Sequence, residues 1–338
     1  MKFEKILTRA WSMCYVASSL TLDGTVYGAF ASESHDTTGA VALDARLQEM
    51  PLWDAPGGCM GIIQVPGMEE FLTIQRFYPV FQSEQAEIAW YYRKHGAWVR
   101  KVLLTVPFVH RIELLRENGA WYLLICKLCQ SKAFIDDWST AGSVLACRLL
   151  PEHRSVGPLV TVLEGLYKNH GLVRIPGDND RALVAHSDGV HELSMDDAGR
   201  WQSRQIWDEP CSDVALTGLQ SDGSYGELGV ITPFHGGDFR VLRREDDRWT
   251  ERCCFHDAFG HGIWGGTLAG VPCYLVGFRA GSQGIYCIEP QQGTFRITPV
   301  DTGVGNANLT VFRWDGRHYI GAANRESNTF TIYCASAE

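Results

Sequence analysis

The chain has 338 residues, 45% of them hydrophobic and 11% aromatic, which is enough to bury a large core. Its formal net charge of −9 gives no electrostatic reason to expect a nucleic acid or an anionic membrane surface as partner. No run of about 18 apolar residues is present, and Arg9 interrupts what would be the apolar core of a signal peptide. We therefore expect a cytoplasmic protein whose eleven cysteines are free thiols.

Seven hairpins of one design follow one another along the chain. Each consists of a strand-like run, a tight turn at a glycine and a second strand-like run, and the glycine supplies the positive φ that such turns need. Two more strand-like runs follow each hairpin, as 86–93 and 97–105 do in the second repeat. In chain order the paired runs cover residues 16–22 and 26–31, 60–65 and 71–76, 110–115 and 121–126, 170–175 and 182–186, 213–219 and 228–232, 261–268 and 273–279, and 306–314 and 319–325.

This periodicity predicts an all-β fold, a seven-bladed β-propeller with four-stranded antiparallel blades that forms a single domain over residues 1–338. The last blade has only three strand-like runs after Asn306, whereas the run at residues 3–8 belongs to no hairpin. We expect this N-terminal strand to close the last blade, because closure removes open sheet edges that would otherwise promote aggregation.

Polar residues begin the innermost strands of five successive blades. These strands all start at one face of a propeller, so their first side chains should converge on one end of the central channel. Three imidazoles with carboxylate or amide oxygens could hold a divalent metal such as Mn, Zn or Ca. Two alternatives are a hydrogen-bonded, water-filled channel and direct use of an imidazole as a general base. The candidate metal ligands are His110, His170, Asp213, His261 and Asn306.

A second ring of titratable residues comes at the ends of the second strands. Arginine matches a carboxylate through two parallel hydrogen bonds, so this ring predicts a basic funnel for the carboxylate or phosphate of a small substrate. The alternative is that these residues pair with channel acids such as Asp136, Asp137, Asp213 or Glu326. The second ring comprises Arg76, Lys127, His186, His235, Arg279 and Arg325.

Further candidates lie in loops on the same face. His235 is followed by two glycines that allow a substrate close to the backbone, and we favour it as general base, with His170 as the channel histidine that could share this role. Tyr78 is a candidate proton donor, or a packing residue. The long loop at residues 130–142 has Trp138, which could stack on a sugar ring, and Asp137, which could bind its hydroxyls. Simple packing over the channel mouth is the alternative for this loop.

The repeated apolar strand, Asp-Gly turn and apolar strand, as at 23–24, 222–223 and 315–316, resembles the FG-GAP/VCBS-like class of propellers. Over its whole length the layout is similar to the propeller of aldos-2-ulose dehydratase and to seven-bladed polysaccharide lyases. The Asp-x-Asp-x-Asp calcium loops of many such repeats are missing. The resemblance implies a site at the central face, with His110, His170 and His261 at the channel mouth. It further implies action on carbohydrate by elimination, sometimes with a divalent metal.

Together these patterns favour a carbohydrate-active lyase or dehydratase, a carbon–oxygen lyase that acts on a sugar or uronate. It would work by proton abstraction and β-elimination on a small anionic or oxidised sugar in the central pocket, with or without a metal. We expect no nucleotide cofactor. A non-catalytic propeller that binds a ligand or a protein is the alternative, and a sugar isomerase or epimerase would share the same proton abstraction. Titratable residues directed at the channel favour the enzyme.

Overall fold

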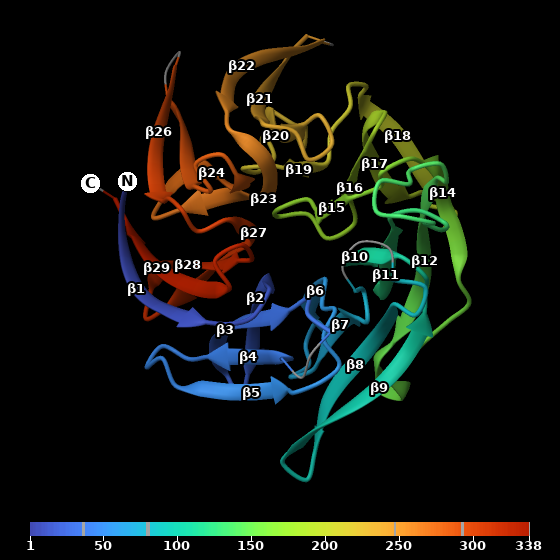
Figure 1. Cartoon of the computed structure of the whole chain (residues 1–338). Coiled ribbons are helices and arrows are strands. Elements are labelled where there is room, and N and C mark those ends of the chain that lie inside the picture. Colours follow the sequence, from blue (N-terminus) through green and yellow to red (C-terminus); the bar gives the residue numbers. More distant parts are fainter. Residues whose placement is uncertain (36–37, 79–81, 247, 292–293, 338) are drawn as a thin grey trace.

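Seven four-stranded antiparallel sheets form a ring around a central channel in the computed structural model (Figure 1), which describes residues 1–35, 38–78, 82–246, 248–291 and 294–337. The predicted all-β, seven-bladed propeller is confirmed. The described residues contain one short 3-10 helix, η1 (Pro151–His153), and none of their helices is long and apolar enough to cross a bilayer. All eleven cysteines are free.

The blades follow one another in chain order, and each runs from the channel outwards. Blade 1 has β2 (Cys14–Leu22), β3 (Thr25–Ser32), β4 (Ala40–Leu43) and β5 (Glu49–Trp53). Blade 2 has β6 (Gly61–Gln64), β7 (Phe71–Gln75), β8 (Glu87–Lys94) and β9 (Ala97–Thr105). Blade 3 has β10 (Val109–Glu117), β11 (Ala120–Lys127), β12 (Gly142–Leu150) and β14 (Val160–Leu166), with the short β13 (Ser155–Val156) beside β12.

The second half of the ring repeats this arrangement. Blade 4 has β15 (Gly171–Arg174), β16 (Ala182–His186), β17 (Gly189–Met195) and β18 (Trp201–Trp207). Blade 5 has β19 (Asp213–Ala215), β20 (Glu227–Thr232), β21 (Asp238–Glu245) and β22 (Arg248–His256), so its inner strand is shorter than the run 213–219 predicts. Blade 6 has β23 (Ala258–Leu268), β24 (Val271–Ala280), β25 (Ile285–Gln291) and β26 (Thr294–Asp301).

The two ends of the chain close the ring in blade 7. This blade joins β27 (Asn306–Trp314), β28 (Arg317–Asn324) and β29 (Thr329–Ser336) to the N-terminal strand β1 (Lys2–Ala10), which pairs antiparallel with β29. Phe30 of blade 1 stacks on Phe330 of blade 7 with ring centroids 4.2 Å apart, so the core continues across the seam. The expected closure by the N-terminal strand is therefore present.

Candidate functional site

β-Bulges direct the side chains that line one mouth of the channel. In blades 1, 3, 6 and 7, the pairing of the first two strands skips one residue near the start of the first strand. Such a bulge leaves the extra residue outside the hydrogen-bond ladder and re-aims its side chain. The skipped residues are Tyr15, His110, His261 and Ala307. One tyrosine and two histidines thereby occupy equivalent points of the ring.

Four imidazoles gather at this mouth, and two of them contact the Tyr15 hydroxyl. His170 directly precedes β15, and His235 lies in the loop between β20 and β21. The Nε2 atoms of these two histidines are 3.2 Å apart. The Tyr15 hydroxyl lies 3.1 Å from Nε2 of His261 and 3.3 Å from Nε2 of His110. One ring nitrogen from each of His170, His235 and His261 lies within 4.8 Å of the other two.

The outer nitrogens of three of these four rings have partners of their own. Nδ1 of His261 is 2.7 Å from the carbonyl oxygen of Ala307, to which it donates, and Nδ1 of His170 is 3.0 Å from Oδ2 of Asp213. Nδ1 of His110 lies 3.4 Å from the carbonyl oxygen of His170. Donation through Nδ1 leaves Nε2 with its lone pair, which is the usual arrangement of a metal-binding histidine. These histidines therefore offer Nε2 lone pairs, which can accept hydrogen bonds or bind a metal, at the centre of the cluster.

This arrangement fits a divalent transition metal. The single hydroxyl proton of Tyr15 cannot serve Nε2 of both His110 and His261, so acceptors outnumber donors around it. For metal–nitrogen bonds of about 2.05 Å, two ligand nitrogens lie about 2.9 Å apart at a right angle and about 3.4 Å apart at a tetrahedral angle. The 3.2 Å between Nε2 of His170 and Nε2 of His235 falls between these values. Zinc or manganese suits such a nitrogen-rich set better than calcium.

Burial keeps the imidazoles neutral. Desolvation lowers the pKa of His110, His170, His235 and His261 well below the usual value, and the neighbouring cationic and imidazole groups lower it further. Burial raises the pKa of Asp213, against the effect of the nearby Arg111 guanidinium. Neutral imidazoles at neutral pH can act as ligands or as bases.

The cluster forms the floor of a cavity of about 570 Å³, which we call the histidine cavity. Such a volume suits a small molecule. Arg279 donates to Oε1 of Glu326 at 2.5 and 2.8 Å, and Arg325 donates to Oε1 of Glu33 at 2.5 Å. The two guanidiniums on its wall are thus each paired with an acid. The lining residues are Tyr15, Glu33, Met60, Phe77, His110, Leu128, Lys132, Ile135, Asp136, Trp138, His170, Phe234, His235, Phe259, His261, Arg279 and Arg325.

Three residues of the expected second ring lie away from this cavity. Arg76 is 3.0 Å from Oε1 of Glu87, and Lys127 donates to Oε1 of Gln130 at 2.5 Å. His186 packs against His191, with ring centroids 5.1 Å apart. None of the three is among the described residues that line the histidine cavity. Arg279, Arg325 and His235 alone bring the second ring to the site.

The loop between β11 and β12 contributes its aromatic residue. Trp138 lines the cavity, where its ring packs edge-to-face on Phe234 and lies 3.2 Å beneath the ammonium of Lys132. Asp137 instead accepts hydrogen bonds from the backbone N–H groups of Ala133 and Ser139, and so shapes the loop. Asp136, its neighbour, reaches the cavity.

Tyr78 and Asn306 make their contacts outside the histidine cavity. The Tyr78 ring stacks on His35 with centroids 3.9 Å apart and is not among the described lining residues. The Asn306 amide donates to the carbonyl oxygens of Asn308 and Ala323, both at 3.0 Å, and a Cβ on Gly277 would lie only 2.1 Å from its Oδ1. Asn306 therefore bonds within blade 7, packs closely against Gly277 of blade 6 and lies outside the histidine group.

Four further residues that line the cavity are not predicted from the sequence: Tyr15, Glu33, Lys132 and Phe259. Tyr15 had a clear signal, because it lies nine residues before the turn glycine Gly24, as His110 does before Gly119. Glu33 had none, since it lies beyond a strand end and becomes part of the site only through its contact with Arg325.

A second group of ligand-type side chains lies on the outer strands of blade 5. Asp238, Cys254 and His256 offer atoms within 4.8 Å of one another, and Nδ1 of His256 is 2.7 Å from Oδ1 of Asp238. The His256 side chain is exposed. This surface group provides a comparison for metal binding at the channel mouth.

His186 offers a test of burial by pH. Its Nδ1 accepts from the Asp188 N–H at 3.2 Å, and burial, with His191 nearby, lowers its pKa to about 4. The unfolded chain takes up this proton near pH 6.5 but the folded chain does not, so stability falls as pH drops below about 6.5. Between pH 7 and pH 5 the wild type should lose about 2 kcal/mol more stability in urea unfolding than His186→Asn. An equal loss in both proteins contradicts this, and the exposed His153→Asn should behave as wild type.

Comparison with solved structures finds propellers over nearly the whole chain. A protein of Bacteroides fragilis provisionally described as a 6-phosphogluconolactonase has 13% identity and a TM-score of 0.59, covering 94% of this chain and 89% of its own. A Bacteroides uniformis protein with the same provisional description has 13% identity and a TM-score of 0.58, with coverage of 96% and 92%. A puromycin-hydrolyzing peptidase of Mycobacterium tuberculosis has 12% identity and a TM-score of 0.55, covering 93% of this chain and 49% of its own.

The comparisons show the fold. At these identities they do not carry an activity from one chain to another. No protein-family model matches the sequence, and no curated protein matches it. The resemblance to FG-GAP/VCBS-like propellers and to lyases therefore stays a prediction.

Proposed function

We propose that the chain is a metal-assisted carbon–oxygen lyase that acts on a small oxidised or anionic sugar in the histidine cavity. The observation that carries this proposal is the convergence of three imidazole nitrogens within 4.8 Å of one another, at the floor of a cavity walled by Arg279 and Arg325. The names of the structural neighbours, which refer to sugar lactones, are compatible with such a substrate.

The chain's own residues have distinct roles in this proposal. His170, His235 and His261 would hold the ion, with Asp213 positioning His170 through Nδ1. A bound divalent metal supplies Lewis acidity toward a carbonyl or carboxylate oxygen. Arg279 and Arg325 would orient the substrate's carboxylate, although each must also satisfy its acid partner.

The elimination can be written with His110 as base. Its neutral Nε2 would take the proton next to the substrate carbonyl or carboxylate, and the C–H electron pair forms the new double bond. The β-hydroxyl leaves as water with a proton from Tyr15, whose pKa burial raises to about 12, so that it is a neutral donor. Tyr15 replaces Tyr78 here because it lines the cavity. His235, favoured from the sequence as base, acts as such only where it does not hold the metal.

Incubation with a panel of aldonic and uronic acids tests the activity. Dehydration of a 2,3-dihydroxy acid yields a 2-keto acid, which semicarbazide traps as an absorbing product. We expect this signal only after the protein has been loaded with zinc or manganese, and its loss after chelation. Full activity of chelated protein contradicts metal assistance, and a metal-loaded protein that turns over no member of the panel contradicts the substrate class.

A further inference from the structure

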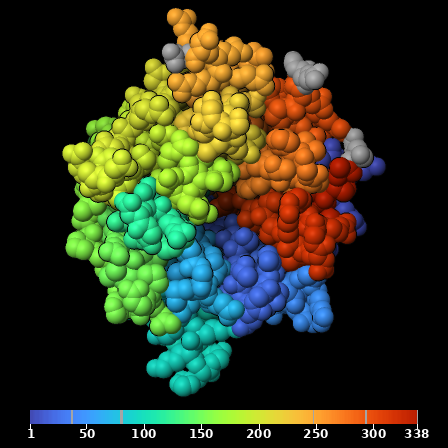
Figure 2. All heavy atoms as spheres, turned by 180° about the vertical axis from the view of Figure 1, so that it is seen from behind, coloured from blue at the N-terminus to red at the C-terminus, as the bar shows by residue number. Residues whose placement is uncertain are grey.

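A second cavity, of about 450 Å³, opens at the other mouth of the channel. The turns between the first and second strands of the blades gather on this face, which Figure 2 shows with its blades around a central hollow. We call it the hairpin-face cavity. Its polar lining includes residues of the inner strands and of the blade 4 turn, together with His261, which also lines the histidine cavity. The strand residues are Arg111, Glu113, Arg174, Asp213, Trp264 and Asn308, and the turn residues are Asp178 and Asn179.

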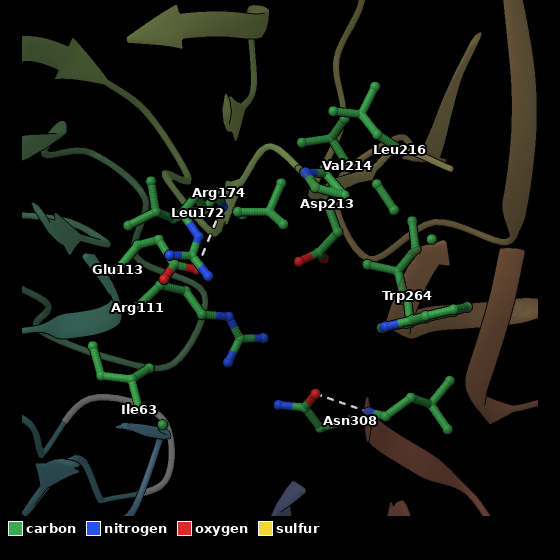
Figure 3. Close-up of a pocket in the computed structure, with 18 of the residues that line it drawn as sticks. Ile63, Arg111, Glu113, Leu172, Arg174, Asp213, Val214, Leu216, Trp264 and Asn308 are labelled. Atoms are coloured by element: carbon green, nitrogen blue, oxygen red, sulfur yellow. Dashed lines mark hydrogen bonds between the residues drawn. The ribbon is translucent and has the colours of Figure 1, made fainter. Parts of the chain in front are cut away.

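Three N–H donors of this cavity point toward its centre. The Arg111 guanidinium extends into the open space, and Trp264 presents the edge of its ring that bears Nε1 (Figure 3). Asn308 accepts the Leu309 N–H through Oδ1 at 2.8 Å, which leaves Nδ2 directed inwards (Figure 3). Among the described residues, neither Trp264 Nε1 nor Asn308 Nδ2 donates a hydrogen bond. These donors are available to a ligand.

The two arginines of the cavity, Arg174 and Arg111, differ in their ionic partners. Glu113 accepts from the backbone N–H groups of Leu114 and Arg174, at 3.1 and 3.3 Å, and its charge offsets that of Arg174 nearby. Arg111 donates to the Met60 carbonyl oxygen at 3.1 Å, and no described carboxylate forms an ion pair with it. Asp213 of the same cavity interacts with Arg111 only at longer range. The Arg111 guanidinium thus has room for a direct anionic partner inside a partly enclosed space, where a charge-assisted hydrogen bond is strongest.

We propose that the hairpin-face cavity binds a small hydroxycarboxylate. Its carboxylate would lie against Arg111, with the N–H groups of Asn308 and Trp264 as further donors. The carboxylate of Asp213 faces the same space (Figure 3) and would accept from a hydroxyl of the ligand. Aliphatic side chains such as Leu172 and Val214 complete the lining against its carbon chain.

Calorimetric titration with D-gluconate tests this site, with D-glucitol as the neutral match. We expect gluconate to bind and glucitol to bind at least about tenfold more weakly, because only gluconate can form the ion pair. Asn308→Asp keeps the acceptor for Leu309 and the side-chain volume but adds a negative charge, and it should weaken gluconate binding at least about tenfold. Arg111→Gln should do the same.

The histidine cavity supplies the control. His235→Ala alters a side chain that lines the histidine cavity and is not among the described residues of the hairpin-face cavity, so it should leave gluconate binding at the hairpin face intact, whatever the outcome of the lyase assay. Gluconate binding that is lost in His235→Ala but kept in Asn308→Asp would place the ligand in the histidine cavity and overturn the proposal. Equal binding of glucitol, or no binding by the wild type, would also overturn it. Thermal melting checks that each variant is folded.

Discussion

Alanine at His170 is expected to reduce the metal content of the protein to less than about a tenth of that of the wild type, and to abolish measurable elimination. His170 lies at the centre of the cluster, 3.2 Å from His235 between Nε2 atoms and 3.0 Å from Asp213 through Nδ1. Its removal takes away one ligand nitrogen and leaves the Asp213 carboxylate without its imidazole partner. Elemental analysis after dialysis against zinc or manganese measures the effect.

A matched variant separates this site from the surface. His256→Ala removes one member of the exposed group on blade 5 and should leave tightly bound metal unchanged. Comparing the melting temperatures of chelated wild type and chelated His170→Ala reports folding without metal. If His170→Ala retains full metal while His256→Ala loses it, the metal lies on blade 5 and the proposed centre is wrong.

Methionine at Arg325 is expected to lower the free energy of unfolding by about 3 kcal/mol, because it leaves the buried Glu33 carboxylate without the guanidinium that donates to it. Burial already raises the pKa of Glu33, and Arg325 is the main group that opposes this rise. The double variant Arg325→Met and Glu33→Gln should regain most of this stability, since no unpaired buried charge remains. Urea unfolding of the two variants measures the difference.

The single and double variants together distinguish a role of Arg325 in stability from a role in substrate binding. If Arg325 orients substrate, the double variant should be stable but show a KM raised at least about tenfold. Recovery of wild-type KM together with stability would show that Arg325 serves only to neutralise Glu33. Persistent instability of the double variant would contradict the burial argument.

The turn chemistry and periodicity of the sequence were sufficient to predict the ring, its blade order and the strand that closes it. Which side chains face the channel mouth was harder to predict, because a shift of one residue along the strand changes the answer. Counting from the first polar residue selects Asn306, whereas counting nine residues back from Gly316 selects Ala307, the residue that the bulge actually displaces. The same count would have found Tyr15. A bulge changes which side chain faces the channel and leaves hardly any trace in hydrophobic alternation.

It was harder to predict from the sequence which side chains at the ends of the second strands reach the cavity. Arg76, Lys127 and His186 occupy the same register as Arg279 and Arg325, yet their partners turn them away from the cavity. Gln130 is a local partner of Lys127, but the sequence does not show which way the lysine turns. Glu87 becomes a neighbour of Arg76 only when β7 and β8 pair, so sequence register does not reveal it. Long-range pairs such as Glu33 with Arg325, at opposite ends of the chain, are hidden for the same reason.

The bulged positions in the inner strands of blades 1, 3, 6 and 7 also make the channel mouth open to redesign. Because the displaced side chain takes no part in strand pairing, its chemistry can change while the blade keeps its register. In blade 7 this position is held by Ala307, an apolar residue. A substitution at one of these positions can therefore change the chemistry of the channel mouth and leave the other blades unchanged, so that new reactivity could arise one blade at a time.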